Sequence, residues 1–357
     1  MKRIILTGGG TAGHVTPNIA LIPALKKAGY DIHYIGSKNG IERRLIQDLD
    51  IPYHPISSGK LRRYFDLKNF TDPFRVMRGY FQASRLIRKL KPDILFSKGG
   101  FVSVPVVIAA NRKKVPVIIH ESDITPGLAN KLSFGSARKV CCNFPETVRY
   151  LPEGKAVLTG SPIRTELFSG TREKGLALCG FRPDKPVLLV MGGSLGSVAI
   201  NNAVRASLDS LADEFQIIHL CGKGHLDPNL DTREGYCQFE YISKELPDLF
   251  AAADLFISRA GANTICEILA LKKPNILIPL TAAASRGDQL LNAASFEKSG
   301  YSYVLQEENV TRDSLLEAVH HVFQNKDNYI TALCKGAENS AVDLIMQLIN
   351  SYSRNKN

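Results

Sequence analysis

The sequence lacks the features that mark several large classes of protein. No apolar run reaches the roughly 18 residues that a membrane-spanning helix needs, and no signal peptide is expected at its start. Its seven cysteines include no C-x-x-C pair, their number is odd, and most lie in apolar segments. They are therefore expected to be reduced core residues of a cytosolic protein. No cluster of residues has the spacing of metal ligands, so no metal is expected.

Acidic residues are scarce in the first half of the chain. Residues 1–160 hold 26 Lys and Arg against 11 Asp and Glu, whereas residues 161–357 hold 19 against 23. With 357 residues, 44% of them apolar and 22% charged, the chain is long enough for two domains with full cores. The uneven charge predicts that the two halves meet different surroundings.

The first turn of the chain is the stretch around which the rest is organised. An apolar run at 4–6 predicts a buried parallel strand, and the glycines at 8–10 end it. A helix is expected next, because Pro17 is tolerated only in a first turn and Gly29 suits a C-terminal cap. Such a turn is an anion-binding nest of free N–H groups. His14 lies at its mouth, where a neutral imidazole could act as a base.

The same turn also matches a dinucleotide fingerprint. Gly8, Gly10 and Gly13 satisfy G-x-G-x-x-G, which in a nicotinamide or flavin site is accompanied by an acidic residue at the end of the second strand. That strand is expected at 31–35, and Asp31 begins it rather than ends it. The sequence therefore disfavours a dinucleotide site.

Short apolar runs alternate with helical patterns in both halves, which is typical of α/β proteins built from βαβ units. Residues 160–164 are the expected crossing point between two domains, and a closing helix at 344–352 is expected to fold back on the first. Two parallel-sheet domains facing each other would form a cleft between the carboxyl ends of their strands. Strands are expected at 3–7, 31–35, 53–56, 94–97, 117–120, 139–143 and 156–159, then at 187–191, 216–220, 237–241, 255–258, 275–279 and 302–305.

Two further glycine loops follow predicted strands, at 97–103 and 191–197. Three such loops, two in one domain and one in the other, indicate a substrate whose phosphates lie across the cleft. The loop at 191–197 begins a helix expected over 198–211, and the N–H groups of that helix could hold a diphosphate without a metal.

The most specific stretch is 258–270, where a turn of small residues leads into a helix that carries Glu267. A carboxylate there can bind both hydroxyls of a ribose while the backbone of the turn approaches a sugar. The plainer explanation is a glutamate favoured near a helix N-terminus. Gln289 and Asn292 offer further polar groups at the start of the next helix.

Residues 60–91 hold ten basic residues and only two acidic ones, interleaved with aromatic residues. One interpretation is a solvated helix whose aromatic side chains face the core. A second is a peripheral membrane face, with aromatics at the headgroup level and cations attracted to anionic lipid. Nucleic acid is a third, which the lack of an accompanying RNA- or DNA-binding motif disfavours.

Taken together, these residues resemble the MurG family, the N-acetylglucosaminyltransferases that act on a lipid-linked muramyl-pentapeptide in peptidoglycan synthesis. The resemblance implies a GT-B fold with two Rossmann-like domains, here 1–162 for the acceptor and 163–340 for the UDP-sugar donor, and a C-terminal helix within 341–357. It runs nearly end to end through Gly8–His14, Gly99–Ser103, His120-Glu121, Gly160–Arg164, Gly192-Gly193-Ser194 and the Glu267 segment with Gln289 and Asn292.

The resemblance also implies roles for the matching residues. His14 would be the base in an inverting, metal-independent transfer of GlcNAc from UDP-GlcNAc to the 4-hydroxyl of lipid I, giving lipid II. Residues 60–91 would rest on the cytoplasmic face of the cell membrane, so that a peripheral enzyme serves cell-wall biogenesis, cell shape and cell division. The donor would meet Arg164, Ser194, Ile242, Glu267, Gln289 and Asn292, and the diphosphate and acceptor loops would use Thr11, Ala12, Gly13, Gly100, Asp123 and Gly193.

Two departures from the family pattern bear on the acceptor. Ala12 replaces the usual second glycine of its loop, and residues 122–127 read Ser-Asp-Ile-Thr-Pro-Gly where the family often has Gln-Asn-Gly. The alternatives are a related enzyme with another lipid acceptor, a glycolipid glycosyltransferase, an epimerase of the sugar nucleotide, and a non-catalytic protein that binds nucleotides or nucleic acid. A protein that only binds nucleotides or nucleic acid would not need both Glu267 and His14.

Overall fold

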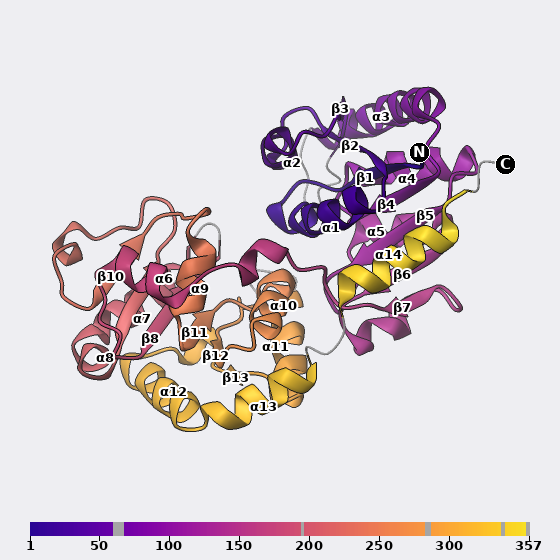
Figure 1. The fold of residues 1–357 in the computed structure, drawn as a ribbon. Helices are drawn as coiled ribbons and strands as arrows, with labels where there is room; N and C mark the ends of the chain where they lie inside the picture. Colours follow the sequence, from indigo (N-terminus) through magenta and orange to yellow (C-terminus); the bar gives the residue numbers. More distant parts are fainter. Residues whose placement is uncertain (60–67, 194–195, 283–286, 337–339, 355–357) are drawn as a thin grey trace. The chain divides into compact units, whose positions relative to one another are not determined.

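The computed structural model describes residues 1–59, 68–193, 196–282, 287–336 and 340–354, without the side chains of residues 68–73. The chain divides into two compact units (Figure 1). Unit 1 comprises residues 1–164 and 339–357, and unit 2 comprises residues 165–338. Unit 2 is therefore inserted between two segments of unit 1. The sequence had placed the boundary near 162.

Unit 1 is built on a seven-stranded parallel sheet with the order β3-β2-β1-β4-β5-β6-β7. All seven predicted strands are present, with β2 two residues and β5 one residue longer, and β6 and β7 one residue shorter, than predicted. The strands are β1 (Arg3–Thr7), β2 (Asp31–Ser37), β3 (Tyr53–Ile56), β4 (Ile94–Ser97), β5 (Val117–Glu121), β6 (Lys139–Cys142) and β7 (Ala156–Leu158), and the main helices are α1 (Thr16–Lys27), α2 (Ile41–Ile46), α3 (Lys68–Leu90), α4 (Ser103–Arg112), α5 (Leu128–Ser133) and α14 (Ala341–Tyr352).

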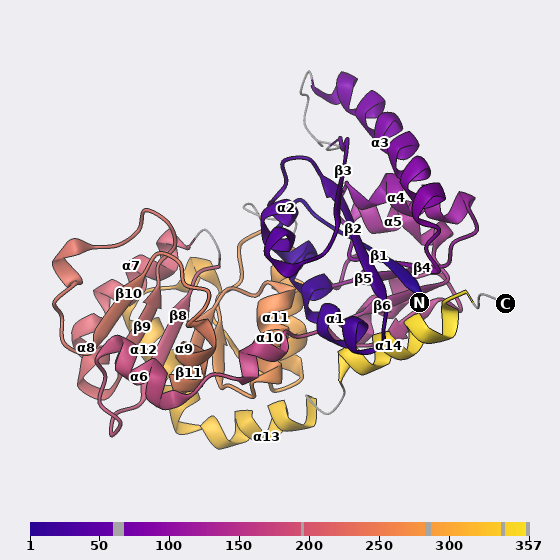
Figure 2. The same ribbon diagram turned by 45° about the horizontal axis from the view of Figure 1, so that its top comes forward.

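Helices cover both faces of this sheet, which explains why its strands are apolar without alternation. On β1, Ile5 packs into a core with α3 and α4, whereas Ile4 and Leu6 pack into a second core with α1 and α14. All three side chains are fully buried. Figures 1 and 2 show α3 and α4 on the face of the sheet away from α1 and α14.

The last helix of the chain belongs to the first unit. Ile345 and Ile349 of α14 lie in the same buried cluster as Ile4, and α14 packs against α1. The hydroxyl of Tyr30 donates a hydrogen bond to Asn350 Oδ1 at 2.9 Å. The helix begins at Ala341, three residues before the predicted start, because Ser340 caps its N-terminus.

Unit 2 holds a six-stranded parallel sheet with the order β10-β9-β8-β11-β12-β13. Its six strands were all predicted, although β10, β12 and β13 end before the predicted residue. They are β8 (Val187–Met191), β9 (Gln216–Leu220), β10 (Tyr236–Phe239), β11 (Leu255–Ser258), β12 (Asn275–Leu277) and β13 (Tyr303–Val304), with α6 (Arg172–Cys179), α7 (Val198–Ala206), α8 (Leu208–Glu214), α9 (Leu246–Ala252), α10 (Ala262–Ala270), α11 (Asp288–Lys298), α12 (Arg312–Gln324) and α13 (Lys326–Gly336).

The prediction of one helix over 198–211 is wrong in one respect, because the helix is interrupted at Ser207. The hydroxyl of Ser207 donates to the carbonyl of Ala203 at 2.8 Å, and its backbone N–H is shared between Ala203 O at 3.1 Å and Val204 O at 3.0 Å. A serine that bonds back to the carbonyl four residues earlier competes with the regular helical ladder. The result is two short helices, α7 and α8, in place of one.

None of the helices in the described ranges combines the length and apolarity that crossing a bilayer requires.

Candidate functional site

The first glycine loop turns tightly at the carboxyl end of β1. A Cβ atom on Gly8 would lie 2.3 Å from the carbonyl oxygen of His14, so only glycine fits there. The chain folds back on this loop as a short 3-10 turn, Ala12–His14, which carries the predicted base. The ring Nδ1 of His14 lies 2.8 Å from Thr11 Oγ1. This hydrogen bond fixes the orientation of the imidazole.

The second glycine loop touches the first. Gly99 and Gly100 follow β4 with φ angles of +91° and +83°, which side chains rarely adopt. A Cβ atom on Gly100 would lie 2.1 Å from the carbonyl oxygen of Gly9. Strands β1 and β4 are neighbours in the sheet, so their carboxyl ends bring the two predicted loops into contact.

The expectation of free N–H groups in the first glycine loop is wrong at Gly10. Its backbone N–H donates to Glu42 Oε2 at 3.2 Å, and Glu42 also accepts hydrogen bonds from the N–H and hydroxyl of Ser37. Glu42 is fully buried, and a Cβ atom on Gly9 would lie 2.5 Å from its carboxyl carbon. A protein carboxylate thus binds part of the loop that the sequence assigned to an anionic ligand. Sequence reasoning missed Glu42, since an acid in the first turn of a helix is ordinary.

A second buried carboxylate shapes the segment 122–127, where the sequence departs from the family pattern. Glu121, at the end of β5, is 5% exposed. Its Oε1 accepts from the N–H groups of Ser122 and Asp123, at 2.8 and 3.1 Å. Its Oε2 accepts from Gly127 N and Asn130 Nδ2, at 3.0 and 2.8 Å. Burial, and then the charge of Asp123, raise the pKa of Glu121, while the hydrogen bonds from Asn130 and Asp123 N and the charge of Lys98 lower it.

Lys98 joins the same network from the neighbouring strand. It follows β4, is 1% exposed, and its ammonium donates a hydrogen bond to Ser122 Oγ. Burial and the charge of Lys98 lower the pKa of His120 well below its usual value. His120 is therefore neutral, and its Nε2 lies 2.9 Å from Gly160 O. His120 thus contacts the loop at Gly160, and Glu121 holds the segment 122–127.

The glycine loop of unit 2 lies against the end of β9. A Cβ atom on Gly196, whose φ is +77°, would lie 2.0 Å from the carbonyl oxygen of Cys221. Gly193 also has a positive φ of +92°. The loop ends at Ser197, whose hydroxyl caps α7 by accepting from Ile200 N at 3.3 Å. Ser194, a predicted donor residue, lies outside the described residues.

A buried arginine ties together the carboxyl ends of four neighbouring strands in unit 2. Arg259 directly follows β11 and is 7% exposed. Its Nη2 donates to Ser197 Oγ, beyond β8, at 2.7 Å, and to Glu307, beyond β13. Its Nη1 donates to the carbonyls of Ile278 and Pro279, beyond β12, at 3.2 and 3.3 Å. The one sequence signal for this role was a cation directly after an apolar strand.

The remaining predicted donor residues follow strand ends in unit 2. Glu267 is half-buried in the middle of α10, and Ile242 lies just beyond β10. Gln289 Oε1 accepts from Leu280 N at 3.0 Å. Asn292 is fully buried and donates to Ala260 O at 3.2 Å, so it supports the turn before α10.

Arg164 is the last residue of unit 1. Within the described ranges, no group of three or more His, Cys, Asp or Glu side chains could hold a metal ion.

Two family models match the chain, one in each unit. Residues 4–142 match the glycosyltransferase family 28 N-terminal domain, and residues 187–348 match the glycosyltransferase family 28 C-terminal domain. A protein of Lachnoclostridium phytofermentans is 64% identical over 98% of both chains, and one of Lachnospira eligens is 62% identical over 99% of this chain and all of its own. Both are named UDP-N-acetylglucosamine–N-acetylmuramyl-(pentapeptide) pyrophosphoryl-undecaprenol N-acetylglucosamine transferase.

Solved structures agree with these matches. A crystal structure of Acinetobacter baumannii MurG is 25% identical, with a TM-score of 0.76 over 98% of this chain and 100% of that one. A UDP-GlcNAc 2-epimerase of Neisseria meningitidis is 13% identical with a TM-score of 0.67 over 98% of this chain, and it shares the fold alone. The predicted fold class, an α/β GT-B fold of two Rossmann-like domains, is confirmed. The chain belongs to glycosyltransferase family 28, among the MurG-type N-acetylglucosamine transferases.

Proposed function

We propose that this protein transfers N-acetylglucosamine from UDP-N-acetylglucosamine to the 4-hydroxyl of the muramyl sugar of undecaprenyl-diphospho-N-acetylmuramyl-pentapeptide, with inversion. The product is lipid II. The family membership supports the reaction. The hydrogen bond of 2.8 Å between Thr11 Oγ1 and His14 Nδ1 is the observation that carries the mechanism.

In one of the two tautomers that this bond allows, the histidine can act as a base. When Nδ1–H donates to the Thr11 hydroxyl, Nε2 carries the lone pair that accepts a proton. The acceptor 4-hydroxyl would give its proton to Nε2 as its oxygen attacks the anomeric carbon of the donor sugar. The contacting loops at Gly9 and Gly100 would place the acceptor's diphosphate, with Thr11, Ala12, Gly13 and Asp123 beside it.

The donor would bind to unit 2. Glu267 would accept hydrogen bonds from the ribose hydroxyls, the backbone at Ile242 would meet the uracil, and Gln289 would bind the sugar. Asn292 would act indirectly, because its buried amide holds Ala260. Gly193 and Ser194 would approach the diphosphate, and Arg164 would neutralise the charge that develops on the leaving UDP.

Replacing His14 tests the mechanism. His14→Ala is expected to lower turnover by about 10²–10⁴-fold, the usual loss when a general base is removed, and to leave the binding of UDP unchanged. Turnover would be measured with UDP-GlcNAc and a lipid-linked muramyl acceptor, and UDP binding by calorimetry. Thr11→Val should lower turnover less, whereas Thr11→Ser keeps the hydroxyl and serves as the matched control. Near-normal turnover in His14→Ala would remove this residue from the role of base.

We also propose that the diphosphate needs no metal. Backbone N–H groups at the loop of Gly193 and the guanidinium of Arg164 would supply the positive charge that a cation supplies elsewhere. Excess EDTA is therefore expected to leave turnover unchanged. A loss that Mg²⁺ restores would contradict this proposal.

The exposed face of α3 supports a peripheral membrane site. Phe74, Met77 and Phe81 are 74%, 57% and 63% exposed, and their spacing of three and four residues places them on one face. The opposite face, with Ala83 and Ile87, is buried in the core. The interpretation in which the aromatic residues face the core is therefore wrong for Phe74 and Phe81, whereas Tyr80 packs against the core. The predicted residues at 60–67 lie outside the described residues.

Exposed arginines at 75, 78, 85 and 88 share α3 with this apolar face. Such a helix would insert its aromatics at the headgroup level and attract anionic lipid. Changing Phe74, Met77 and Phe81 together to Ser should abolish cosedimentation with vesicles that contain phosphatidylglycerol. Phe168→Ser, which removes a phenylalanine that is 55% exposed in unit 2, should not. Equal losses of cosedimentation in the two variants, or no loss in either, would reject the membrane site on α3. Neither an epimerase nor a nucleotide-binding protein needs this face.

A further inference from the structure

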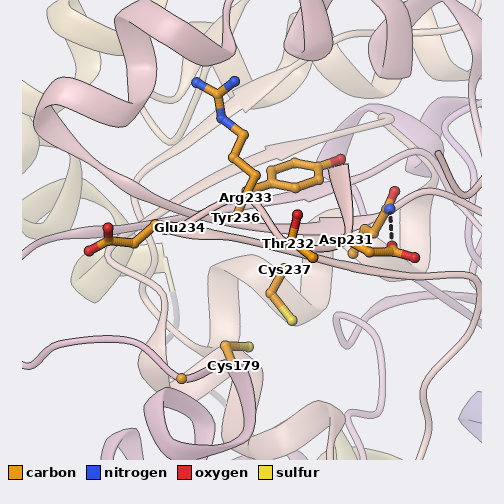
Figure 3. Close-up of a pocket in the computed structure, with 10 residues that line it drawn as sticks. Cys179, Asp231, Thr232, Arg233, Glu234, Tyr236 and Cys237 are labelled. Carbon is orange, nitrogen blue, oxygen red and sulfur yellow. Dashed lines mark hydrogen bonds between the residues drawn. The ribbon is translucent and has the colours of Figure 1, made fainter. Parts of the chain in front are cut away.

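Two cysteines distant in the sequence meet at the edge of the unit 2 sheet. Cys179 is the last residue of α6, and Cys237 is the second residue of β10, the edge strand. Both line a pocket of about 330 Å³. Figure 3 shows the side chains of Cys179 and Cys237 pointing toward each other, below Thr232 in this view. Both residues are partly exposed, so small reagents can reach them.

The two thiols influence each other's ionisation. Their interaction is the largest cause of a lowered pKa at Cys237 and of a raised pKa at Cys179. Cys237 is therefore the member that ionises first. Where burial is the largest cause, the pKa of a thiol rises instead, to about 12 at Cys141 and about 11 at Cys142. A thiolate that is partly exposed is the reactive form of cysteine.

We propose that Cys179 and Cys237 are a dithiol site that closes to a disulfide on reaction with a hydroperoxide. The Cys237 thiolate attacks one peroxide oxygen, so an S–O bond forms, the O–O bond breaks, and the leaving oxygen takes up a proton as water. The Cys179 sulfur then attacks the resulting sulfenic sulfur. An S–S bond forms, the S–O bond breaks, and the hydroxide leaves with the Cys179 proton as a second water. Two thiols are oxidised by two electrons and one hydrogen peroxide is reduced.

The position of the pair gives this bond a structural consequence. It would join the end of α6 to the edge strand and close a loop that contains β8, β9 and α7. Cross-linking two points far apart in the sequence restricts the unfolded chain and stabilises the folded one. The oxidised protein should therefore melt at a higher temperature than the reduced protein.

The test uses the full chain treated with one equivalent of hydrogen peroxide at neutral pH. After alkylation and trypsin digestion, the peptide of residues 175–205 should be linked to that of residues 234–244, because prolines after Arg182 and Lys185 block cleavage there. Two thiols should be lost for each chain, and dithiothreitol should restore both. Cys334→Ser, which removes an exposed cysteine on another helix, is the matched control and should retain the link.

Two single variants test which cysteines form the link. Cys179→Ala and Cys237→Ala should each abolish the link. In Cys179→Ala the remaining thiol loses its partner, so its alkylation by iodoacetamide at neutral pH should slow several-fold relative to the unoxidised wild type. Links to any other cysteine, irreversible oxidation of Cys237 without a link, or an unchanged alkylation rate would overturn the assignment.

Discussion

The loops at the carboxyl ends of the two sheets are held by charges of opposite sign. In unit 1, two buried carboxylates, Glu42 and Glu121, accept hydrogen bonds from backbone N–H groups of the loops. In unit 2, the buried guanidinium of Arg259 donates to backbone carbonyls and to Ser197. The same fold is thus stabilised at the same edge in two opposite ways.

The difference bears on how each unit can bind an anion. A carboxylate occupies loop N–H groups, which are the groups that a phosphate needs. The guanidinium of Arg259 occupies carbonyls instead, and its charge is paired with the carboxylate of Glu307. In unit 1 the loop N–H groups at Gly10, Ser122, Asp123 and Gly127 are therefore already bound by carboxylates, whereas Arg259 in unit 2 leaves loop N–H groups unoccupied by its own hydrogen bonds.

Removing the guanidinium of Arg259 is expected to have the largest effect on stability. Arg259→Met leaves Glu307, whose side chain is 18% exposed, without its partner. The free energy of unfolding of unit 2 should fall by about 3–5 kcal/mol, the usual loss when one member of a buried pair is removed. Urea denaturation gives the loss, and hydrogen exchange assigns it to unit 2.

The matched control is Arg182→Met. Its ion pair with Asp184 is exposed at both side chains, by 63% and 70%. Such pairs contribute about 0–1 kcal/mol. Equal losses in the two variants would show that Arg259 does not hold the four strand ends together.

Removing the charge of Glu121 is the corresponding change in unit 1. In Glu121→Gln the amide presents N–H groups to loop N–H donors, so buried donors lose their acceptor. The free energy of unfolding should fall by about 2 kcal/mol. KM for the lipid acceptor should rise while the affinity for UDP stays constant. The exposed Glu153, changed to Gln, is the control, and a rise in UDP Kd in Glu121→Gln would contradict the assignment to the acceptor side.

Acid should destabilise unit 2 through His219. Burial, and then the charge of Arg205, lower the pKa of His219 to about 3 in the folded protein. A histidine in the unfolded chain titrates near 6.5, so between these values the unfolded state binds more protons. Stability is therefore full above about pH 6.5 and falls with acidification, by about 2 kcal/mol at pH 5.

His219→Gln should lack this part of the pH dependence. Its free energy of unfolding should change between pH 7 and pH 5 by about 2 kcal/mol less than that of the wild type. Urea titrations at the two pH values measure the difference. His120 of unit 1 is also buried and neutral, so a remaining slope is expected in the variant. Identical slopes in variant and wild type would show that His219 is protonated in the folded state.

The smallest effect is expected from Glu42→Gln. The charge-assisted bonds to Gly10 and Ser37 weaken, which should lower the free energy of unfolding by about 1.5 kcal/mol. Asp343→Asn is the control, because Asp343 is an exposed acid in the first turn of α14 and contributes about 0.3–1 kcal/mol through the helix dipole. If Glu42→Gln falls within that range and leaves acceptor KM unchanged, Glu42 does not position the glycine loop.

Elements with a local cause could be predicted from the sequence. Parallel strands covered on both faces are continuous apolar runs, such as 187–191, and all of them were found. The glycine loops were recognisable for the same reason, since Gly8 and Gly100 are required by contacts within a few residues or with the neighbouring strand. The break at Ser207 was not predictable, because the apolar periodicity continues through it.

The partners of the loops could not be predicted, because the fold brings them together from distant positions. Glu42 lies 32 residues from Gly10, and Arg259 lies 48 residues from Glu307. Each looks ordinary in its own segment. The orientation of α3 was equally hidden, because apolar residues lie on both of its faces and only the packing of Ala83 and Ile87 selects the buried one.

The return of α14 to unit 1 sets an order for folding during translation. Unit 2 is fully synthesised once residue 338 has been added, whereas the core beside β1 waits for Ile345 and Ile349. Unit 1, whose first strands are synthesised before those of unit 2, is therefore completed after unit 2. A chain cut after residue 338 would hold its proposed donor domain complete, while the domain that holds His14 would lack one side of its core.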